Sequence, residues 1–236
     1  MKEPRVLIRC LRVSGRSRNL VAERVAVEHQ IDIYVNGTLE RSLVCSPGSD
    51  ELLIRGHLLS EGLISTNAEV LDIRRSNDQY HVQLSGTSDI DRDSPSALAV
   101  RPSDIMKTVH DMMENQEHHK VTGAFHAAIL RELGTEKSFS CEDISRHCVV
   151  DKVIGYGAVN DFDLSRSLLI TSGRLTSSIV SKAVRCHIPI LGSLTVATER
   201  GVLLAKTNNL TLVGALTRAD YWLYHEGSTR IVTSER

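Results

Sequence analysis

Aromatic residues make up only 4% of the 236 residues, and the formal net charge is −1. A surface that stacks nucleic-acid bases usually needs exposed aromatic rings, and a binder of duplex DNA or of a membrane surface usually carries a broad basic field. The five cysteines include no Cys-x-x-Cys pair, so neither a zinc ribbon nor a thioredoxin-type redox site is indicated. These absences argue against nucleic-acid and membrane partners and leave room for a local anion site.

The N-terminal region also lacks the features of a targeting or membrane segment. Residues 1–20 carry five arginines but no long apolar core, so they do not have the pattern of a signal peptide. No apolar run in the chain approaches the roughly 20 residues that cross a bilayer. We therefore expect a cytoplasmic protein with reduced thiols, in which residues 1–20 form a flexible basic leader.

Signatures of several common enzyme classes are missing as well. Neither Gly-x-Ser-x-Gly nor a P-loop is present. A zinc-dependent base deaminase needs His-x-Glu and Pro-Cys-x-x-Cys, whereas His126 is followed by two alanines and no Pro-Cys-x-x-Cys occurs. A hydrolase or deaminase with a protein-held metal is therefore disfavoured.

The N-terminal half has the pattern of a small strand-rich domain. Alternating apolar and polar residues over 25–44 predict strands, and Asn36-Gly37 predicts a hairpin turn between them. A Ser-, Asp- and Pro-rich stretch, residues 85–103, indicates a linker loop at a domain boundary. The sequence thus predicts an α+β domain over residues 21–103 that ends in this loop. The other elements expected in it are a helix over 49–59 and strands over 70–73 and 80–84.

Beyond the loop, helical and strand-like patterns alternate, which is typical of an α/β domain with helices packed on a sheet. The expected helices cover 104–117, 125–132, 145–159, 176–186 and 198–206. The expected strands cover 138–140, 168–171, 188–191 and 210–215. The sequence therefore predicts an α/β domain over residues 104–236.

Small polar residues follow several of these strands just before a helix begins. In α/β sheets the ligand crevice lies beyond the carboxyl ends of the strands, where helix N-termini offer N–H groups to anions. Ser172-Gly173-Arg174 suits a phosphate, because it combines a hydroxyl, an open backbone and a planar guanidinium. A plain turn or ordinary helix capping is the alternative at each position. The other candidates are Thr122, Gly123, His126, Lys182, Thr198 and the loop Leu216, Thr217, Arg218, Ala219, Asp220 and Tyr221.

The densest polar cluster lies in residues 142–152, at an expected helix start. Asp143 or Ser145 can cap the helix. His147 and Asp151 are four residues apart, so they share a helix face on which the carboxylate can orient the imidazole. A solvated helix face is the alternative, but the position between a strand and a helix favours a ligand site. The candidate ligand-binding residues are Glu142, Asp143, Arg146, His147, Asp151 and Lys152.

In combination and order, these motifs resemble the formate dehydrogenase accessory protein family (FdhD/NarQ). The resemblance runs from about Val25 to Ile231, and its most specific element is Glu142-Asp143-Ile144-x-Arg146-His147 followed by Asp151-Lys152. The other matching elements are Val35-Asn36-Gly37, Ser46-Pro47, residues 55–64, Thr122-Gly123-x-x-His126, Ser172-Gly173-Arg174 with Lys182, and residues 210–214.

The resemblance implies a homodimer with a cytidine-deaminase-like α/β domain that has lost the zinc site, preceded by a smaller strand-rich α+β domain. It implies a sulfur carrier that receives sulfur from a cysteine desulfurase as a persulfide. The sulfur would pass to the molybdenum cofactor, in its bis-molybdopterin guanine dinucleotide form, before that cofactor enters formate dehydrogenase. The candidate residues above would then bind the cofactor, with a contribution from the loop 216–221.

The chain departs from this family where the sulfur is carried. The family's sulfur-carrying cysteines lie in a loop between the two halves, whereas residues 85–103 contain no cysteine. Sulfur transfer requires a thiolate that holds the persulfide. Cys148 is a candidate substitute, because a helix N-terminus lowers a thiol's pKa, and a packing role is the alternative. Two functions stay open: a cofactor-binding sulfurtransferase and a non-catalytic cofactor-binding chaperone.

Overall fold

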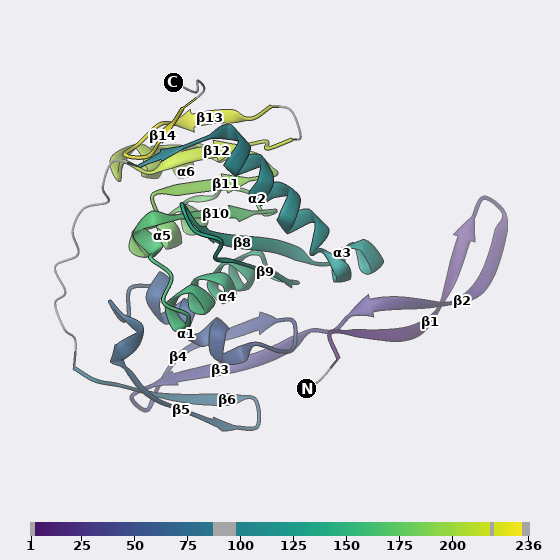
Figure 1. Cartoon of the computed structure of the whole chain (residues 1–236). Helices are drawn as coiled ribbons and strands as arrows, with labels where there is room; N and C mark the ends of the chain where they lie inside the picture. The colour runs from purple at the N-terminus through teal and green to yellow at the C-terminus, as the bar shows by residue number, and fades with distance from the viewer. Residues whose placement is uncertain (1–2, 87–97, 218–219, 233–236) are drawn as a thin grey trace.

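The chain is described by a computed structural model that covers residues 3–86, 98–217 and 220–232. Two main layers stand one above the other in Figure 1, a four-stranded sheet below and a six-stranded sheet above, with helices between them. In the described part of the chain, no helix is both long and apolar enough to cross a membrane.

The lower layer is an N-terminal sheet with the strand order β4-β3-β6-β5. The predicted turn at Asn36-Gly37 is confirmed: both residues have positive φ, 47° and 86°, as a tight two-residue hairpin turn requires. The predicted helix is also confirmed, as α1 (Asp50–Ser60). The strands of this sheet are β3 (His29–Val35), β4 (Thr38–Cys45), β5 (Val70–Ser76) and β6 (Gln79–Leu84).

The upper layer is a mixed six-stranded sheet with the order β13-β12-β11-β10-β8-β9. Its middle strands β10, β11 and β12 run parallel, whereas β8, β9 and β13 pair antiparallel with their neighbours. The strands are β8 (His126–Glu132), β9 (Ser138–Asp143), β10 (Ser167–Thr171), β11 (Ile190–Ser193), β12 (Thr211–Gly214) and β13 (Trp222–His225).

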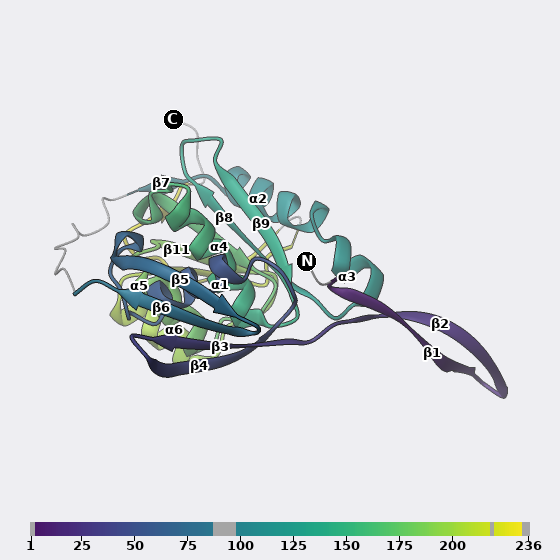
Figure 2. The same cartoon turned by 90° about the horizontal axis from the view of Figure 1, so that it is seen from below.

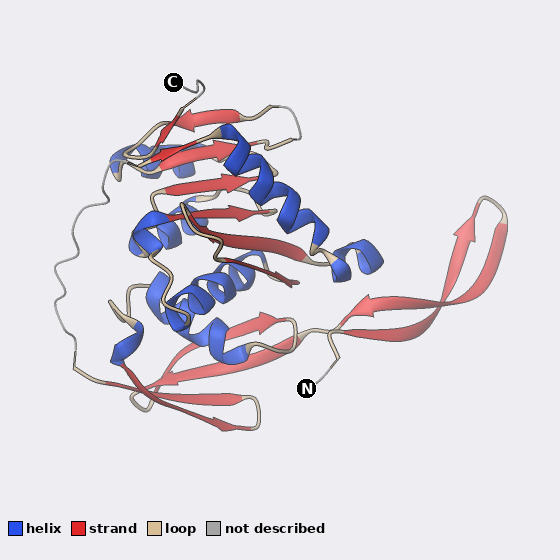
Figure 3. Ribbon diagram, in the orientation of Figure 1, coloured by secondary structure: helices blue, strands red, loops and turns tan. Residues whose placement is uncertain are grey.

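Helices cover both faces of this sheet (Figure 3). Successive residues of a strand point to opposite faces: Ala128 and Leu169 pack with the helices next to the lower layer, whereas Ile129 and Ile170 pack with α2. Both faces are therefore buried, as is usual where helices connect parallel strands such as β10, β11 and β12. The helices are α2 (Pro102–Glu114) on one face, α4 (Arg146–Val159), α5 (Ser177–Arg185) and α6 (Glu199–Thr207) on the other, and the short α3 (Glu117–Thr122).

The two layers share one hydrophobic core. Ile33 of β3, Leu53 of α1 and Val153 of α4 belong to the same buried cluster. Helices α1 and α4 touch along their backbones, because a Cβ added to Gly56 would lie 1.7 Å from the carbonyl oxygen of Asp151. The predicted division of the chain into units before and after residue 103 stays a prediction.

Two sequence-based expectations are wrong. Residues 125–132 were expected to be helical, but β8 fills most of this stretch and lies buried between β9 and β10. The expected flexible leader instead forms most of a long antiparallel hairpin, β1 (Arg5–Ser14) and β2 (Ser17–Ala26), which projects from the body (Figures 1 and 2). Most of the expected linker, residues 87–97, lies outside the described residues. A small parallel pair follows it, β7 (Ala99–Val100) with β14 (Arg230–Ile231).

Candidate functional site

Several of the predicted polar positions meet at one edge of the six-stranded sheet. The parallel strands β10 and β11 end at this edge, where Ser172-Gly173 follows the one and Ser193 closes the other. Strand β8 runs antiparallel to β10, so its first residue, His126, lies at the same edge. Helix α4 begins there too, because His126 pairs with Asp143, shortly before the helix. We call this edge the polar edge.

Ser172 and His126 touch at the polar edge. The Ser172 hydroxyl oxygen accepts a hydrogen bond from the Ala127 backbone N–H at 2.9 Å and lies 3.3 Å from Nδ1 of His126. Burial lowers the pKa of His126, and the neighbouring Arg146 guanidinium lowers it further. The imidazole is therefore neutral near pH 7, when it can donate one hydrogen bond and accept another.

Arg146 is the first residue of α4 and lies against Gly173. Ser145 caps the helix by accepting from the Cys148 N–H at 3.3 Å. The Arg146 Nε–H is buried and has no hydrogen-bond partner among the described residues. A Cβ added to Gly173 would lie 3.0 Å from the Arg146 Cβ, so an alanine at this position would require the Arg146 side chain to shift. A buried donor without a partner is costly and suits an incoming acceptor such as a phosphate oxygen.

His147 does not pair with Asp151, so the predicted orientation of its ring is wrong. Its Nε2 lies 3.0 Å from the hydroxyl of Ser178 on α5. Burial lowers the pKa of His147, and so does the charge of Arg146. His147 thus extends the polar edge toward the start of α5.

Four charged residues of the predicted site form two buried ion pairs beneath the polar edge. Lys152 lies 2.7 Å from Asp143, whose side chain has no exposed surface. Lys182 of α5 lies 2.9 Å from Asp151, the residue before Lys152 on α4. All four residues are buried. Each can remain charged there because its partner supplies the opposite charge. They join the two layers, so they do not line the polar edge as the sequence suggested.

The buried pairs are completed by residues that the sequence did not predict as part of the site. Ser46 donates to Asp143 through its backbone N–H at 3.1 Å and its hydroxyl at 2.9 Å. Ser60 donates to Asp151 at 2.6 Å and accepts from Lys182 at 2.9 Å. The sequence did signal these positions, since Ser46-Pro47 and residues 55–64 carry part of the resemblance. It did not show which side chains they would contact.

Other predicted residues have local structural roles. The Glu142 carboxylate accepts from the backbone N–H groups of His118 and His119 at 2.7 Å each, at the start of α3. Gly123, at φ 68°, ends this helix after Thr122. Thr198 caps α6 by accepting from the Gly201 N–H. Ordinary capping therefore accounts for these positions.

Only some of the predicted residues in the loop after β12 and in the segment after β10 lie at the polar edge. Leu216 is buried in the core, its backbone N–H donating to Ser193 at 3.0 Å. The Thr217 N–H donates to the Asp220 carbonyl at 3.0 Å, which closes the loop. Arg174 is exposed next to the polar edge, and Tyr221 packs against the core on the α2 side. Arg218 and Ala219 lie outside the described residues.

The thiols near the base of α4 are buried and hard to ionise. Burial, as the largest cause, raises the pKa of Cys148 to about 12 and that of Cys141 to about 12. Burial also raises the pKa of Cys45. The helix start therefore does not make Cys148 a thiolate, and the prediction that it lowers the pKa is wrong. This environment is that of structural cysteines.

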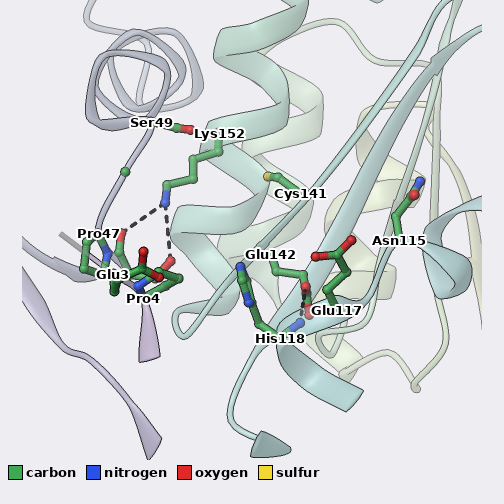
Figure 4. Close-up of a pocket in the computed structure, with 12 residues that line it drawn as sticks. Glu3, Pro4, Pro47, Ser49, Asn115, Glu117, His118, Cys141, Glu142 and Lys152 are labelled. Carbon is green, nitrogen blue, oxygen red and sulfur yellow. Dashed lines mark hydrogen bonds between the residues drawn. The ribbon is translucent and has the colours of Figure 1, made fainter. Parts of the chain in front are cut away.

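A cavity of about 460 Å³ opens beside Lys152, away from the polar edge (Figure 4). It lies between the base of the β1–β2 hairpin, the loop after β4 and helix α3. Figure 4 shows Lys152 pointing toward Pro47, and its ammonium donates to the Ser46 carbonyl oxygen at 3.2 Å. Cys141 and Glu142 also line the cavity. Because Glu142 already caps α3 and Lys152 already pairs with Asp143, these walls are largely satisfied within the chain.

The family model described as the FdhD/NarQ family matches residues 26–94 and 87–232. The chain belongs to the FdhD/NarQ family. It is 29% identical over 224 residues to "Protein FdhD" of Methanocaldococcus jannaschii, an alignment that covers 93% of this chain and 96% of the relative. It is 30% identical over 218 residues to "Sulfur carrier protein FdhD" of Methanothermobacter thermautotrophicus, covering 84% and 87% of the two chains.

The fold of this FdhD/NarQ family member is shared with a solved structure. The crystal structure of a chain from Desulfotalea psychrophila, described as a formate dehydrogenase accessory protein, superposes with a TM-score of 0.85 at 24% identity. The match covers 98% of this chain and 100% of the other. The mixed α/β architecture with several sheets is therefore that of its relative, and the resemblance inferred from the motifs is confirmed.

Proposed function

We propose that this FdhD/NarQ family member is an accessory protein of formate dehydrogenase that binds the bis-molybdopterin guanine dinucleotide cofactor at the polar edge. The names of its relatives support the first part, since they are called a sulfur carrier protein and a formate dehydrogenase accessory protein. The observation that carries the second part is the buried Nε–H of Arg146, which has no hydrogen-bond partner among the described residues and belongs to a side chain packed against Gly173. In this proposal the cofactor is the cargo of the protein.

The chemistry of the polar edge suits the pyrophosphate of such a cargo. Arg146 supplies a guanidinium at the start of α4, where backbone N–H groups also point outward. The glycine at 173 keeps the backbone open, and Ser172 and the neutral His126 add hydroxyl and imidazole groups that donate or accept. The starts of α5 and α6, with Thr176 and Thr198 as their N-cap residues, follow β10 and β11 along the same edge.

A guanine nucleotide tests the proposal. GDP, as a fragment of the cofactor, should raise the melting temperature and change the fluorescence of Trp222, the single tryptophan, which is 67% exposed on β13 next to the loop 216–221. Arg146→Ala should weaken GDP binding about 10- to 100-fold, since a hydrogen bond to a charged group contributes about 1.5–3 kcal/mol. Arg74→Ala, on the far sheet and 82% exposed, is the matched control. Unchanged GDP binding in Arg146→Ala would contradict the proposed site.

A second candidate function, a cofactor-binding chaperone without sulfur transfer, is favoured by the state of the thiols. The segment 85–103 has no cysteine, and the pKa values of Cys45, Cys141 and Cys148 are raised. Incubation with a cysteine desulfurase and cysteine, followed by persulfide trapping and mass spectrometry, separates the two functions. Label on any cysteine supports the sulfurtransferase and excludes the pure chaperone, whereas an unlabelled protein excludes transfer through its own thiols.

We extend the proposal to partners and ancestry. The family resemblance supports a cysteine desulfurase and formate dehydrogenase as protein partners and a homodimer as the assembly. It also supports a cytidine-deaminase-like origin of the six-stranded layer, in which parallel β10, β11 and β12 alternate with helices. A crystal structure with a guanine nucleotide, compared strand by strand with a cytidine deaminase, tests that origin.

A further inference from the structure

Strand β11 ends at the polar edge in a buried serine, Ser193, which the proposed cofactor site does not include. Its side chain has no exposed surface, and its strand lies between the parallel strands β10 and β12. A buried hydroxyl is costly unless its hydrogen bonds are made. The hydrogen-bond partners of Ser193 therefore show which segments depend on it.

The Ser193 hydroxyl uses its full hydrogen-bonding capacity. It donates to the Gly173 carbonyl oxygen at 2.7 Å, which commits its single proton. It accepts from the Thr195 backbone N–H at 2.9 Å. The Thr195 hydroxyl, 3.0 Å away, must then donate to Ser193, because a hydroxyl has one proton and two lone pairs. One bond donated and two accepted fix the orientation of this hydroxyl.

The hydrogen bonds continue from Ser193 to the loop after β12. The Ser193 carbonyl oxygen accepts from the Leu216 N–H at 3.0 Å, and the Thr195 carbonyl oxygen accepts from the Ala215 N–H at 2.7 Å. Ala215 has a φ of 49°, a left-handed conformation that alanine rarely adopts. Because such strain persists only where the surroundings hold it, weakening these bonds lets Ala215 relax and the loop move.

We propose that Ser193 is a positioning residue that couples the turn 172–174 to the loop after β12, so that a phosphate held beside Arg146 orders that loop. The inference rests on the proposed cofactor site. A bound phosphate draws on Arg146, whose side chain packs against Gly173, and so fixes the turn. The Gly173 carbonyl then holds the Ser193 hydroxyl. That hydroxyl holds Thr195 and, through it, Ala215. Buried chains of hydrogen bonds reinforce one another, and such coupling is reciprocal.

A ligand too small to touch both ends can reveal the coupling. Trp222 on β13 pairs with Gly214, the residue before Ala215, whereas Gly173 follows β10. In the sheet order, β10 and β13 are separated by β11 and β12, so the two ends are about 14 Å apart by the usual strand spacing. Inorganic pyrophosphate is shorter than this distance. A change in Trp222 fluorescence when it binds at the turn must therefore pass through the fold.

Titration with pyrophosphate, followed by calorimetry and by Trp222 fluorescence, tests the proposal. The wild type should bind and change its fluorescence, and Arg146→Ala should lose both responses. Ser193→Ala should bind about 3- to 10-fold more weakly, as expected for one hydrogen bond, and should lose most of the fluorescence change even at saturation. A merely structural role would lower the affinity and leave the response at saturation unchanged.

The matched control is Ser167→Ala. Ser167 is also fully buried, and its hydroxyl donates to a backbone carbonyl, that of Asp163 at 2.8 Å. It lies at the other end of β10, so its variant should keep both responses. A full fluorescence change in saturated Ser193→Ala, or a wild type that binds pyrophosphate without a change at Trp222, overturns the inference and leaves the cofactor site standing.

Hydrogen exchange of the wild type gives a second readout that does not depend on how the variants fold. Saturating pyrophosphate should slow exchange of the Ala215 and Leu216 amides by about 5-fold or more, the lower end of usual coupling between sites. Unchanged exchange at both amides overturns the inference, and so does a wild type that binds GDP but not pyrophosphate. A wild type that binds neither ligand overturns the cofactor site and this inference with it.

Discussion

Gly173 and Arg146 touch at the polar edge: a Cβ added to the glycine would lie 3.0 Å from the arginine Cβ. The glycine follows β10 and the arginine opens α4, so the contact joins two segments that are distant in the sequence. The contact constrains where the Arg146 side chain can lie next to Gly173, the residue after Ser172. The close approach is therefore part of the proposed anion site and can be changed by adding one methyl group.

Gly173→Ala should weaken GDP binding without unfolding the protein. The added methyl group must push Arg146 away, and small displacements of a positioned group are costly for binding. We expect a several-fold rise in the GDP dissociation constant, measured by calorimetry. Gly86→Ala, where an added Cβ meets nothing within 4 Å, is the control and should bind as the wild type. Equal affinity in the two variants would contradict the positioning role of Gly173.

Asp143→Asn should strongly destabilise the protein. It leaves the Lys152 ammonium buried without its counter-charge, and breaking a buried ion pair costs about 3–5 kcal/mol. The surface pair of Asp72 and Arg74, 42% and 82% exposed, provides the control, since Asp72→Asn should cost under about 1 kcal/mol. Urea unfolding at pH 7 measures both. Similar losses in the two variants would show that the buried pair does not stabilise the layer contact.

Acid should weaken the contact of α4 with α1 and α5. Burial by itself would raise the pKa of Asp151, but the Lys182 ammonium and the donors His57 and Ser60 lower it overall. Because the folded pKa is lowered, the stabilisation is complete above the ordinary value of 3.8 and is lost as the pH falls through the folded pKa. Asp151→Asn, though less stable at pH 7, should lose less stability below about pH 4 than the wild type. Urea midpoints of Asp151→Asn and the wild type that fall by the same amount between neutral and acid pH would contradict this.

High pH should also weaken the buried pair of Asp151 and Lys182, through loss of the proton from the lysine. Burial by itself would lower the pKa of Lys182, but Asp151 and Glu61 raise it overall. Since the folded pKa is raised, the stabilisation is present below the ordinary value of 10.5 and is lost as the pH rises through the folded pKa. Lys182→Met should therefore show a flatter decline in the free energy of unfolding above about pH 10.5 than the wild type. A decline of equal steepness would rule out this linkage.

Thiol reagents should find few reactive cysteines in the folded protein. The raised pKa values of Cys45, Cys141 and Cys148 keep these thiols protonated at pH 8, and Cys186 is buried. We expect only Cys10, on the β1–β2 hairpin, to react with a disulfide reagent, and all five after unfolding. Cys10→Ser should abolish the rapid phase. Rapid labelling of Cys148 in the folded protein would instead restore it as a sulfur-carrying candidate.

Local signals predicted most of the elements correctly. Asn36-Gly37 permits few conformations other than the tight turn that it forms, and Ser145 marks the start of α4. Residues 125–132 misled the prediction, because alanine, leucine, arginine and glutamate are good helix formers. Burial of this segment between two strands outweighed that local preference. The prediction of a flexible leader was wrong for another reason: its arginines suggested a solvated segment, but residues 5–14 and 17–26 pair as strands.

The sequence predicted only some of the residues at the polar edge. The sequence placed Ser172, Gly173 and Arg146 after strands or at a helix start, and strand ends meet wherever strands run parallel. It also suggested Asp151, Lys152 and Lys182 as ligand contacts. The identity of a charged residue does not show whether its side chain contacts a ligand or a buried counter-charge. Only the packing of α1 against α4 and α5 assigned these three residues to the interior.

By itself the sequence determined the family of this protein and the order of its motifs, because both depend on residue identity and spacing along the chain. The tertiary structure decided which of those motifs meet. It buried the Arg146 Nε–H at the polar edge without a partner among the described residues, enclosed Asp143 with Lys152, and raised the pKa of Cys148. The physical reason is that burial and partner distance, which set the cost of a charge or an unmade hydrogen bond, exist only once distant segments have packed together.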